Sequence, residues 1–236
     1  MTTEFSRILD DIPLSGIRRF FDLVLEADDI ISLGVGEPDF KTPYEIRQKA
    51  IESLQDGYTS YTSNKGIPLL RQSIADYYKD RFNTTYDAIE EILITAGVSE
   101  GVDIVLRAMI NPGDEILVPC PAYVCYSPLV KLAGGIEVSL ETTGGDFILK
   151  ADHIAEKITP KTKALIICSP NNPTGSVIPK SELKKIADLA KKHDLWVISD
   201  EIYAELSYDE PYTSISALPE MKERTVVLSG FSKAFA

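Results

Sequence analysis

The sequence predicts an α/β protein in which a mostly parallel sheet is covered by helices on both faces. From residue 91 onward, short runs rich in Val, Ile and Leu alternate with longer amphipathic segments. Each short run is almost continuously apolar, which is typical of a strand that is buried on both faces, as in a parallel sheet. Residues 1–42 lack this alternation, and we expect them to form an arm or part of a second domain.

Two helices are expected before the alternating part begins. The first should start with Thr42 as its N-cap and Pro43 in the first helical position, with Glu45 three residues after the cap. Gly57 should end this helix, because glycine readily adopts the left-handed backbone conformation found there. The second helix is expected over residues 68–81.

Strands and helices then alternate to residue 229, which is the pattern of a sheet built from parallel strands with crossover helices. We expect strands at residues 91–96, 114–119, 135–140, 163–169, 195–200 and 224–229. We expect helices at residues 99–110, 123–133, 151–158 and 181–193. Pro128 lies inside the second of these helices and is expected to kink it.

Composition and charge exclude several classes of partner. Lys and Arg total 24 and Asp and Glu total 36, so the formal net charge is −12, which disfavours nucleic acid and anionic membranes as main partners. No run approaches the roughly 18 apolar residues of a membrane span, and residues 1–14 do not resemble a secretory signal. Cys120, Cys125 and Cys168 form no zinc-binding pattern and are expected to be free thiols. We therefore expect a cytoplasmic protein without a metal site.

Polar side chains follow the expected strands directly, at the edge where open α/β sheets bind ligands. An amide, a carboxylate, a phenol and an amine should converge there beside a helix that begins after a glycine, which suits a small phosphorylated ligand. Each residue alone could be a turn residue, a helix cap or a solvated lysine, but their joint occurrence at strand ends favours a site. The residues concerned are Gly97, Val98, Ser99, Asn172, Asp200, Tyr203 and Lys233.

Three motifs occur in the order found in the pyridoxal-phosphate-dependent aminotransferases of fold type I, class I/II, which this chain resembles. They are SPNNPTG at 169–175, SDEIY at 199–203 and SGFSKAFA at 229–236. The runs LGVGEPDF at 33–40, YTSNKGIPLLR at 61–71 and CPAY at 120–123 also match. The resemblance covers essentially the whole chain. It implies a large cofactor-binding domain over residues 43–236, preceded at 1–42 by an N-terminal arm and part of the small domain.

The resemblance implies that pyridoxal 5'-phosphate is bound as a Schiff base to Lys233, which then moves a proton between the substrate carbon and the cofactor. Asp200 would face the pyridine nitrogen and keep it protonated, so that the ring can accept electrons. Tyr203 and Asn172 would hydrogen-bond the phenolic oxygen of the ring, and Tyr123 would stack on the ring face. Lys233, Asp200 and Tyr203 are thus the expected catalytic residues.

The resemblance also implies how the phosphate and the substrate are held. Val98 and Ser99 would bind the phosphate at a helix N-terminus. The family often has Ser where this chain has Gly230, and Ser232 is expected to substitute for it. Tyr61 resembles a residue that reaches the phosphate of a neighbouring subunit, which implies a homodimer. Gly36 would lie close to the substrate carboxylate, and Asn172 is the second expected substrate-binding residue.

The implied reaction moves an amino group between an amino acid and a 2-oxo acid, as part of amino-acid metabolism. The resemblance further implies a truncated chain, with the C-terminal part missing after the segment that carries Lys233. That part normally supplies arginines for the cofactor phosphate and for the substrate carboxylate. We therefore expect an incomplete large domain, and a catalytically impaired fragment that only binds the cofactor is one alternative.

Other protein classes fit the sequence less well. Residues 97–101 match the GxSxG pattern of an α/β hydrolase with Ser99 as the nucleophile, but neither His153 nor His193 is well placed to serve it. A dinucleotide-binding loop at residues 34–39 would lack its third glycine. A DNA-binding regulator built on the same fold is opposed by the net charge. The hydrolase stays open as the second alternative.

Overall fold

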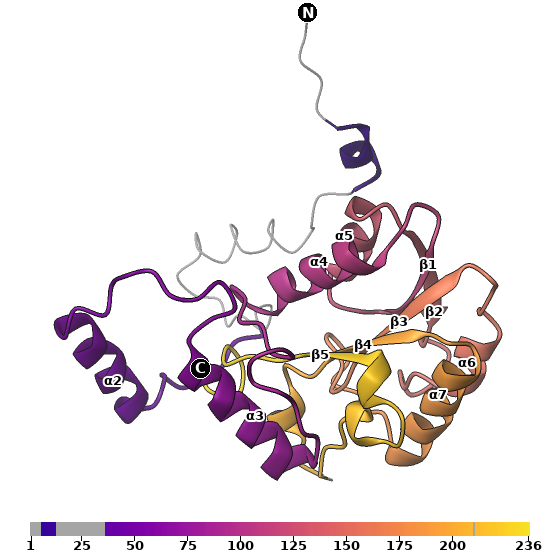
Figure 1. The fold of residues 1–236 in the computed structure, drawn as a ribbon. Helices are drawn as coiled ribbons and strands as arrows, with labels where there is room; N and C mark the ends of the chain where they lie inside the picture. Colours follow the sequence, from indigo (N-terminus) through magenta and orange to yellow (C-terminus); the bar gives the residue numbers. More distant parts are fainter. Residues whose placement is uncertain (1–5, 13–35, 210) are drawn as a thin grey trace, which may run out of the picture.

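A computed structural model describes residues 6–12, 36–209 and 211–236, and a parallel sheet forms its centre (Figure 1). The strand order is β2-β1-β3-β4-β5, and every neighbouring pair is parallel, so the predicted α/β class is confirmed. Most of the expected arm at 1–42 lies outside the described residues. The strands are β1 (Glu115–Cys120), β2 (Ile136–Glu141), β3 (Thr162–Cys168), β4 (Trp196–Asp200) and β5 (Thr225–Leu228).

Helices cover both faces of this sheet, with α4 and α5 on one side and α6 and α7 on the other (Figure 1). The α-helices are α2 (Tyr44–Gln55), α3 (Pro68–Phe82), α4 (Val98–Met109), α5 (Tyr126–Leu132), α6 (Ala151–Ala155) and α7 (Lys180–Lys192). Short 3-10 turns are η1 (Arg7–Asp11), η2 (Ala204–Leu206), η3 (Ile215–Ala217) and η4 (Lys222–Arg224). Helix α2 stands apart from the layered body and buries none of its residues.

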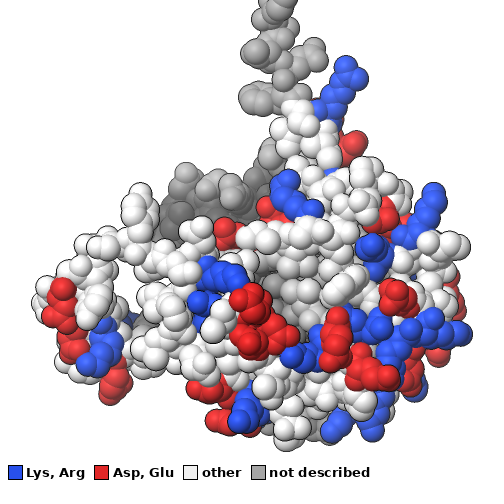
Figure 2. Space-filling view, in the orientation of Figure 1, with Lys and Arg blue, Asp and Glu red and all other residues white. Residues whose placement is uncertain are grey.

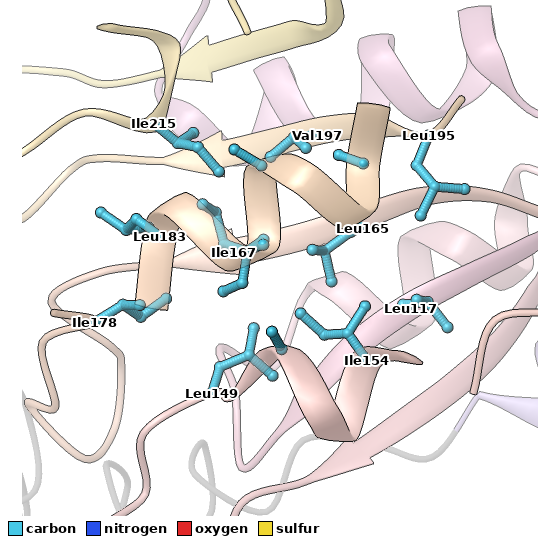
Figure 3. Close-up of a cluster of buried hydrophobic side chains, with 14 of the residues drawn as sticks. Leu117, Leu149, Ile154, Leu165, Ile167, Ile178, Leu183, Leu195, Val197 and Ile215 are labelled. Atoms are coloured by element: carbon cyan, nitrogen blue, oxygen red, sulfur yellow. The ribbon is translucent and has the colours of Figure 1, made fainter. Parts of the chain in front are cut away.

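Neighbouring residues on each strand point to opposite faces, which divides the core into two layers. On β3, Ala164 and Ile166 pack against the α4–α5 layer, while Leu165 and Ile167 pack against the α6–α7 layer. Figure 3 shows the second layer, where apolar side chains from the strands meet those of α6 and α7. Burial of one such aliphatic side chain stabilises the fold by about 1.5–3 kcal/mol. The two layers therefore fix which face each strand residue points to.

Helix α3 forms a third contact, with the segment that follows β4. Its Tyr78 and Phe82 pack against Ala204 in a cluster of aromatic rings. Arg81 of the same helix forms an ion pair with Glu205, with 2.9 Å between the guanidinium Nε and the carboxylate Oε1. The helix therefore holds the chain directly beyond the end of β4.

The prediction of a strand at residues 91–96 is wrong, because this segment forms no strand in the structure. The backbone N–H of Ile94 donates instead to the carbonyl of Lys65, at 3.1 Å. A strand needs a neighbouring strand for its ladder of hydrogen bonds, and the described residues place none beside this segment. The apolar pattern indicated a segment that packs, but it could not indicate whether a partner strand lies next to it.

Two predicted helix starts are also wrong. Pro43, not Thr42, is the N-cap of α2, and the Thr42 hydroxyl donates to the carbonyl of Ala236 instead. Helix α5 begins at Tyr126, later than expected. Pro128 then lies in the first turn, where a backbone N–H has no partner within the helix, so its ring removes no hydrogen bond and requires no kink.

The surface carries charges of both signs. Figure 2 shows acidic and basic side chains interspersed on the face it presents, rather than gathered into a patch of one sign. Among the described residues, no helix has both the length and the apolar character that a membrane crossing requires.

Candidate active site

The ends of the central strands align at one edge of the sheet. Cys168 of β3, Asp200 of β4 and Leu228 of β5 are direct register partners across the two strand pairs. The chain therefore leaves three adjacent strands at the same level. Strand β1 lies between β2 and β3, which makes the gap between β1 and β3 the point where open sheets of this order bind ligands.

Asp200 is the buried carboxyl group at this edge, with 3% of its surface exposed. Its side chain lies on the same face of the sheet as that of Ile198, which packs against α4 and α5. Tyr126 of α5 donates its hydroxyl hydrogen to Asp200 Oδ2 at 2.6 Å, and the backbone N–H of Ile202 donates to Oδ1 at 3.2 Å. Burial raises the pKa of Asp200, and these two hydrogen bonds oppose that rise. No ion pair among the described residues involves Asp200.

Tyr126 was not among the site residues predicted from the sequence. This residue is completely buried and packs edge-to-face with the ring of Tyr123, the residue expected to stack on the cofactor. The available signal was a tyrosine on an otherwise apolar helix face, three residues after Tyr123. A buried tyrosine hydroxyl needs a polar partner, and Asp200 supplies it.

Asn172 and Tyr203 come together as their positions after adjacent strands predicted. The side-chain amide of Asn172 donates from Nδ2 to the Tyr203 hydroxyl at 3.3 Å. Burial raises the pKa of Tyr203, with further contributions from Cys168 and Asp200, so its hydroxyl keeps its hydrogen at neutral pH. The pair therefore presents an amide and a phenol side by side at the sheet edge.

The N-terminus of α4 opens toward the same edge. Its N-cap is Gly97 with a φ of 86°, a conformation that favours glycine, and no side chain caps the first turn. A Cβ atom added to Gly97 would meet no atom within 4 Å, so the space beside its Cα is open. Ser99 in this turn lies 3.3 Å from the Tyr123 hydroxyl, measured between the two oxygens. The turn thus offers uncapped N–H groups and a hydroxyl.

Lys233 lies on the turn that follows β5 and is half-buried. Its Nζ donates to the carbonyl of Gly36 at 3.1 Å, and no hydrogen bond within the described residues joins it to Asp200 or Tyr203. Gly230, where the family often has Ser, passes close to the segment after β4. A Cβ at position 230 would lie 3.3 Å from Ile202 Cδ1, so a larger residue there would require the Ile202 side chain to shift by a few tenths of an ångström.

Two of the expected site residues are exposed to solvent. Tyr61 is fully exposed, and Ser232 is exposed on the turn before Lys233. No hydrogen bond within the described part of the chain connects either of them to the other expected site residues. The structure therefore brings Asp200, Asn172, Tyr203, Tyr123 and Ser99 to one edge, and leaves these two side chains outside it.

The geometry gives the hydrolase alternative no support. Ser99 bonds to Tyr123 rather than to a histidine. His193 is the C-cap of α7, directly before the start of β4, and therefore lies at the opposite edge of the sheet. His153 lies within α6, and no hydrogen bond within the described residues joins it to Ser99. A nucleophile without a base in reach cannot perform hydrolysis by this route.

Comparison with known proteins gives consistent matches along the chain. A family model described as aminotransferase class I and II matches residues 28–236. The Bacillus subtilis (strain 168) protein YugH, whose name places it among the aminotransferases, is 54% identical over 237 residues, covering 100% of this chain and 61% of that protein. An aspartate aminotransferase of Pyrococcus abyssi is 46% identical, covering 97% of this chain and 59% of that protein.

Solved structures match the fold as well as the sequence. The structure of Thermus thermophilus aspartate aminotransferase with maleate superposes with a TM-score of 0.93 at 34% identity, covering 100% of this chain and 62% of that one. The chain spans 59–61% of the length of the first two curated relatives. The family model and these relatives agree over nearly all of the chain. The chain belongs to the family of class I and class II aminotransferases.

Proposed function

We propose that this chain forms the cofactor-binding part of an aminotransferase, which moves an amino group between an amino acid and a 2-oxo acid. The observation that carries the proposal is the sheet edge where Asp200 and the Asn172–Tyr203 pair lie at the ends of neighbouring strands. Relatives named as aspartate and aromatic-amino-acid aminotransferases support the reaction class. Their names differ in substrate, so the proposal extends only to the class of reaction.

The residues at this edge fit pyridoxal phosphate, the cofactor of this family. Asp200 is a buried carboxyl group without a cation among the described residues, and a protonated pyridine nitrogen would supply that charge. The uncapped first turn of α4 offers donors for a phosphate, with open space beside the Cα of Gly97. When bound, the cofactor supplies an electron sink for the charge left on the substrate carbon.

We assign Lys233 as the covalent anchor and as the base that moves the proton. Its Nζ is a primary amine, which bonds to an aldehyde carbon when it is uncharged. Nζ lies against the carbonyl of Gly36, on the loop to which we assign the substrate carboxylate. Released from the aldehyde carbon, Nζ would take a proton from the reacting carbon of the substrate and deliver it to that carbon of the cofactor.

The remaining assignments concern orientation. Asp200 would hold the ring nitrogen, while Tyr203 and Asn172 would donate to the phenolic oxygen at the other side of the ring. Tyr123 would stack on the ring face. The phosphate would lie at the start of α4, and its proposed contacts are Val98, Ser99 and Ser232, together with Tyr61 from a neighbouring subunit.

We further propose that residues 43–236 form the cofactor-binding domain, with the arm and part of the small domain at 1–42, and that the protein is a homodimer. Helix α2 buries no residue and exposes large apolar side chains such as Leu54 at 66%. A second subunit would cover this surface, which water solvates poorly. Sedimentation of the full-length protein should give twice the subunit mass, whereas a monomer at micromolar concentration would contradict the proposal.

A cytoplasmic location is proposed from the cysteines. Cys120, Cys125 and Cys168 are all free thiols, which suits a reducing compartment. Burial raises the pKa of Cys168 to about 12, so this thiol stays uncharged and fills core space. Fractionation of cells that produce the full-length protein measures its location, and recovery outside the cytoplasm would sink this proposal.

Substitution of Lys233 tests the proposed function. Pyridoxal phosphate added to the full-length protein should be trapped covalently by borohydride and found on the peptide that contains Lys233. The variant Lys233→Ala should lose this attachment, because no other amine is expected at the ring. Lys180→Ala, which removes a lysine at the start of α7, is the control and should keep it. Attachment that survives in Lys233→Ala rules out the assignment.

Removal of the Tyr126 hydroxyl tests the role of Asp200. In Tyr126→Phe the carboxylate loses a hydrogen bond that lowers its pKa, so its charged form becomes less favourable. Affinity for pyridoxal phosphate should fall by at least roughly tenfold, because a hydrogen bond to a charged group contributes about 1.5–3 kcal/mol. The loss should grow as the pH falls, since Asp200 is then more often protonated. Titration against Tyr208→Phe, an exposed tyrosine, measures this, and equal affinities at all pH values would refute it.

A further inference from the structure

Glu201, the residue after Asp200, is a buried carboxyl group that the proposed reaction does not use. Side chains alternate along β4: Val197 packs with the α7 layer, and Ile198 packs with the α4–α5 layer. Ser199 and Glu201 continue the face of Val197, whereas Asp200 continues the face of Ile198. The two consecutive carboxyl groups therefore point to opposite faces of the sheet edge.

Hydroxyl groups hold one oxygen of Glu201. Ser214 donates to Oε1 at 2.6 Å, and Ser199 donates to the same oxygen at 3.0 Å. Ser214 is also the N-cap of η3, where it accepts the N–H of Ser216 at 3.3 Å. The backbone N–H of Glu201 donates to the carbonyl of Leu228 at 2.7 Å. Glu201 thus ties the end of β4 both to the end of β5 and to η3.

The second oxygen, Oε2, is buried and has no hydrogen-bond partner within the described residues. Burial raises the pKa of Glu201 to about 7 from an ordinary value of 4.5. Hydrogen bonds from Ser214, Ser199 and Tyr212 oppose this rise, and the charge of Asp200 adds to it. The other groups that face it are tyrosines whose pKa values are raised by burial, so they stay uncharged and none is a cation. They are Tyr77, Tyr78, Tyr86 and Tyr212.

We propose that Glu201 is a positioning residue that acts as a neutral carboxylic acid, fixing the ends of β4 and β5 while Asp200 carries the negative charge. The neutral form removes the charge from Oε2, which is buried and accepts no hydrogen bond within the described residues. The neutral form also spares Asp200 a second charge nearby, at a site where like charges repel strongly. The effect on the cofactor site rests on the proposed function, whereas the protonation state of Glu201 does not.

Difference infrared spectroscopy of the full-length protein measures the protonation state of Glu201 directly. At pH 6 the wild type should show the carbonyl stretch of a protonated carboxyl group that Glu201→Gln lacks. This band should fade as the pH rises, with a midpoint near the pKa of about 7. Glu223→Gln removes an exposed carboxyl group instead and should leave the band in place. If the wild type lacks the band at pH 6, Glu201 is charged and the proposal is wrong.

The pH dependence of stability gives a second readout. The folded protein keeps a proton on Glu201 that the unfolded chain releases near pH 4.5, so the wild type loses stability as the pH rises from about 4.5 to about 7. Glu201→Gln removes this dependence. The unfolding constant of the wild type, divided by that of the variant, should therefore rise on the order of a hundredfold between pH 5 and pH 8. A constant ratio would overturn the proposal.

Cofactor affinity tests the positioning role. Glu201→Gln keeps a neutral side chain of similar shape, so below pH 6 its affinity for pyridoxal phosphate should stay within about threefold of the wild type. Glu201→Ala leaves the hydroxyls of Ser199 and Ser214 without their hydrogen-bond acceptor and should weaken binding by at least roughly tenfold. Equal affinity in all three proteins, or an equal loss in both variants, contradicts the positioning role. If the wild type itself binds no cofactor, the proposed function and the positioning role both fail, while the infrared result still decides the protonation state.

If Glu201→Ala does not fold, Glu201→Gln carries the comparison alone. Its affinity should then match that of the wild type below pH 6, where both side chains are neutral. Above pH 8 the wild type should bind the cofactor more weakly than the variant, because the charge on Glu201 makes the charged form of Asp200 less favourable. Affinities that do not diverge with pH would contradict the proposal.

Discussion

The burial of the Asp200 carboxyl group at the end of β4 is the constraint on which the site depends. A charged group taken out of water is costly unless hydrogen bonds or an opposite charge compensate it. Tyr126 and the Ile202 N–H supply two hydrogen bonds, yet burial still raises the pKa of Asp200. This end of β4 therefore favours a ligand that brings a positive charge to the carboxylate, which is what a protonated pyridine ring would provide.

The alternation of side chains along β4 lets two carboxyl groups serve different purposes. Asp200 points toward α5, where a single tyrosine backs it, and Glu201 points toward η3, where serine hydroxyls hold it. The two carboxyl groups therefore have different hydrogen-bond partners, as is common where two acids at one site have distinct roles. On this account Asp200 carries the negative charge that faces the cofactor, and Glu201 holds the ends of β4 and β5 in place.

The parallel sheet and the meeting of Asn172 with Tyr203 could be predicted from the sequence, because strand ends in a parallel sheet share one edge. The contact between Tyr126 and Asp200 could not, because it depends on where α5 begins and how that helix is rotated on the sheet. The segment 91–96 was misassigned because an apolar run does not specify a partner strand. The exposed Tyr61 shows a further limit, since a residue assigned to a neighbouring subunit has no reason to be buried within its own chain.

The protonation of the cofactor ring nitrogen reports on the Asp200 interaction most directly. Nitrogen-15 magnetic resonance of labelled pyridoxal phosphate, bound to the full-length protein, distinguishes a protonated pyridine from an unprotonated one. We expect a protonated nitrogen in the wild type between pH 6 and pH 8, and an unprotonated nitrogen in Asp200→Asn, which has no negative charge to hold the proton. An unprotonated nitrogen in the wild type would contradict the role assigned to this buried carboxylate.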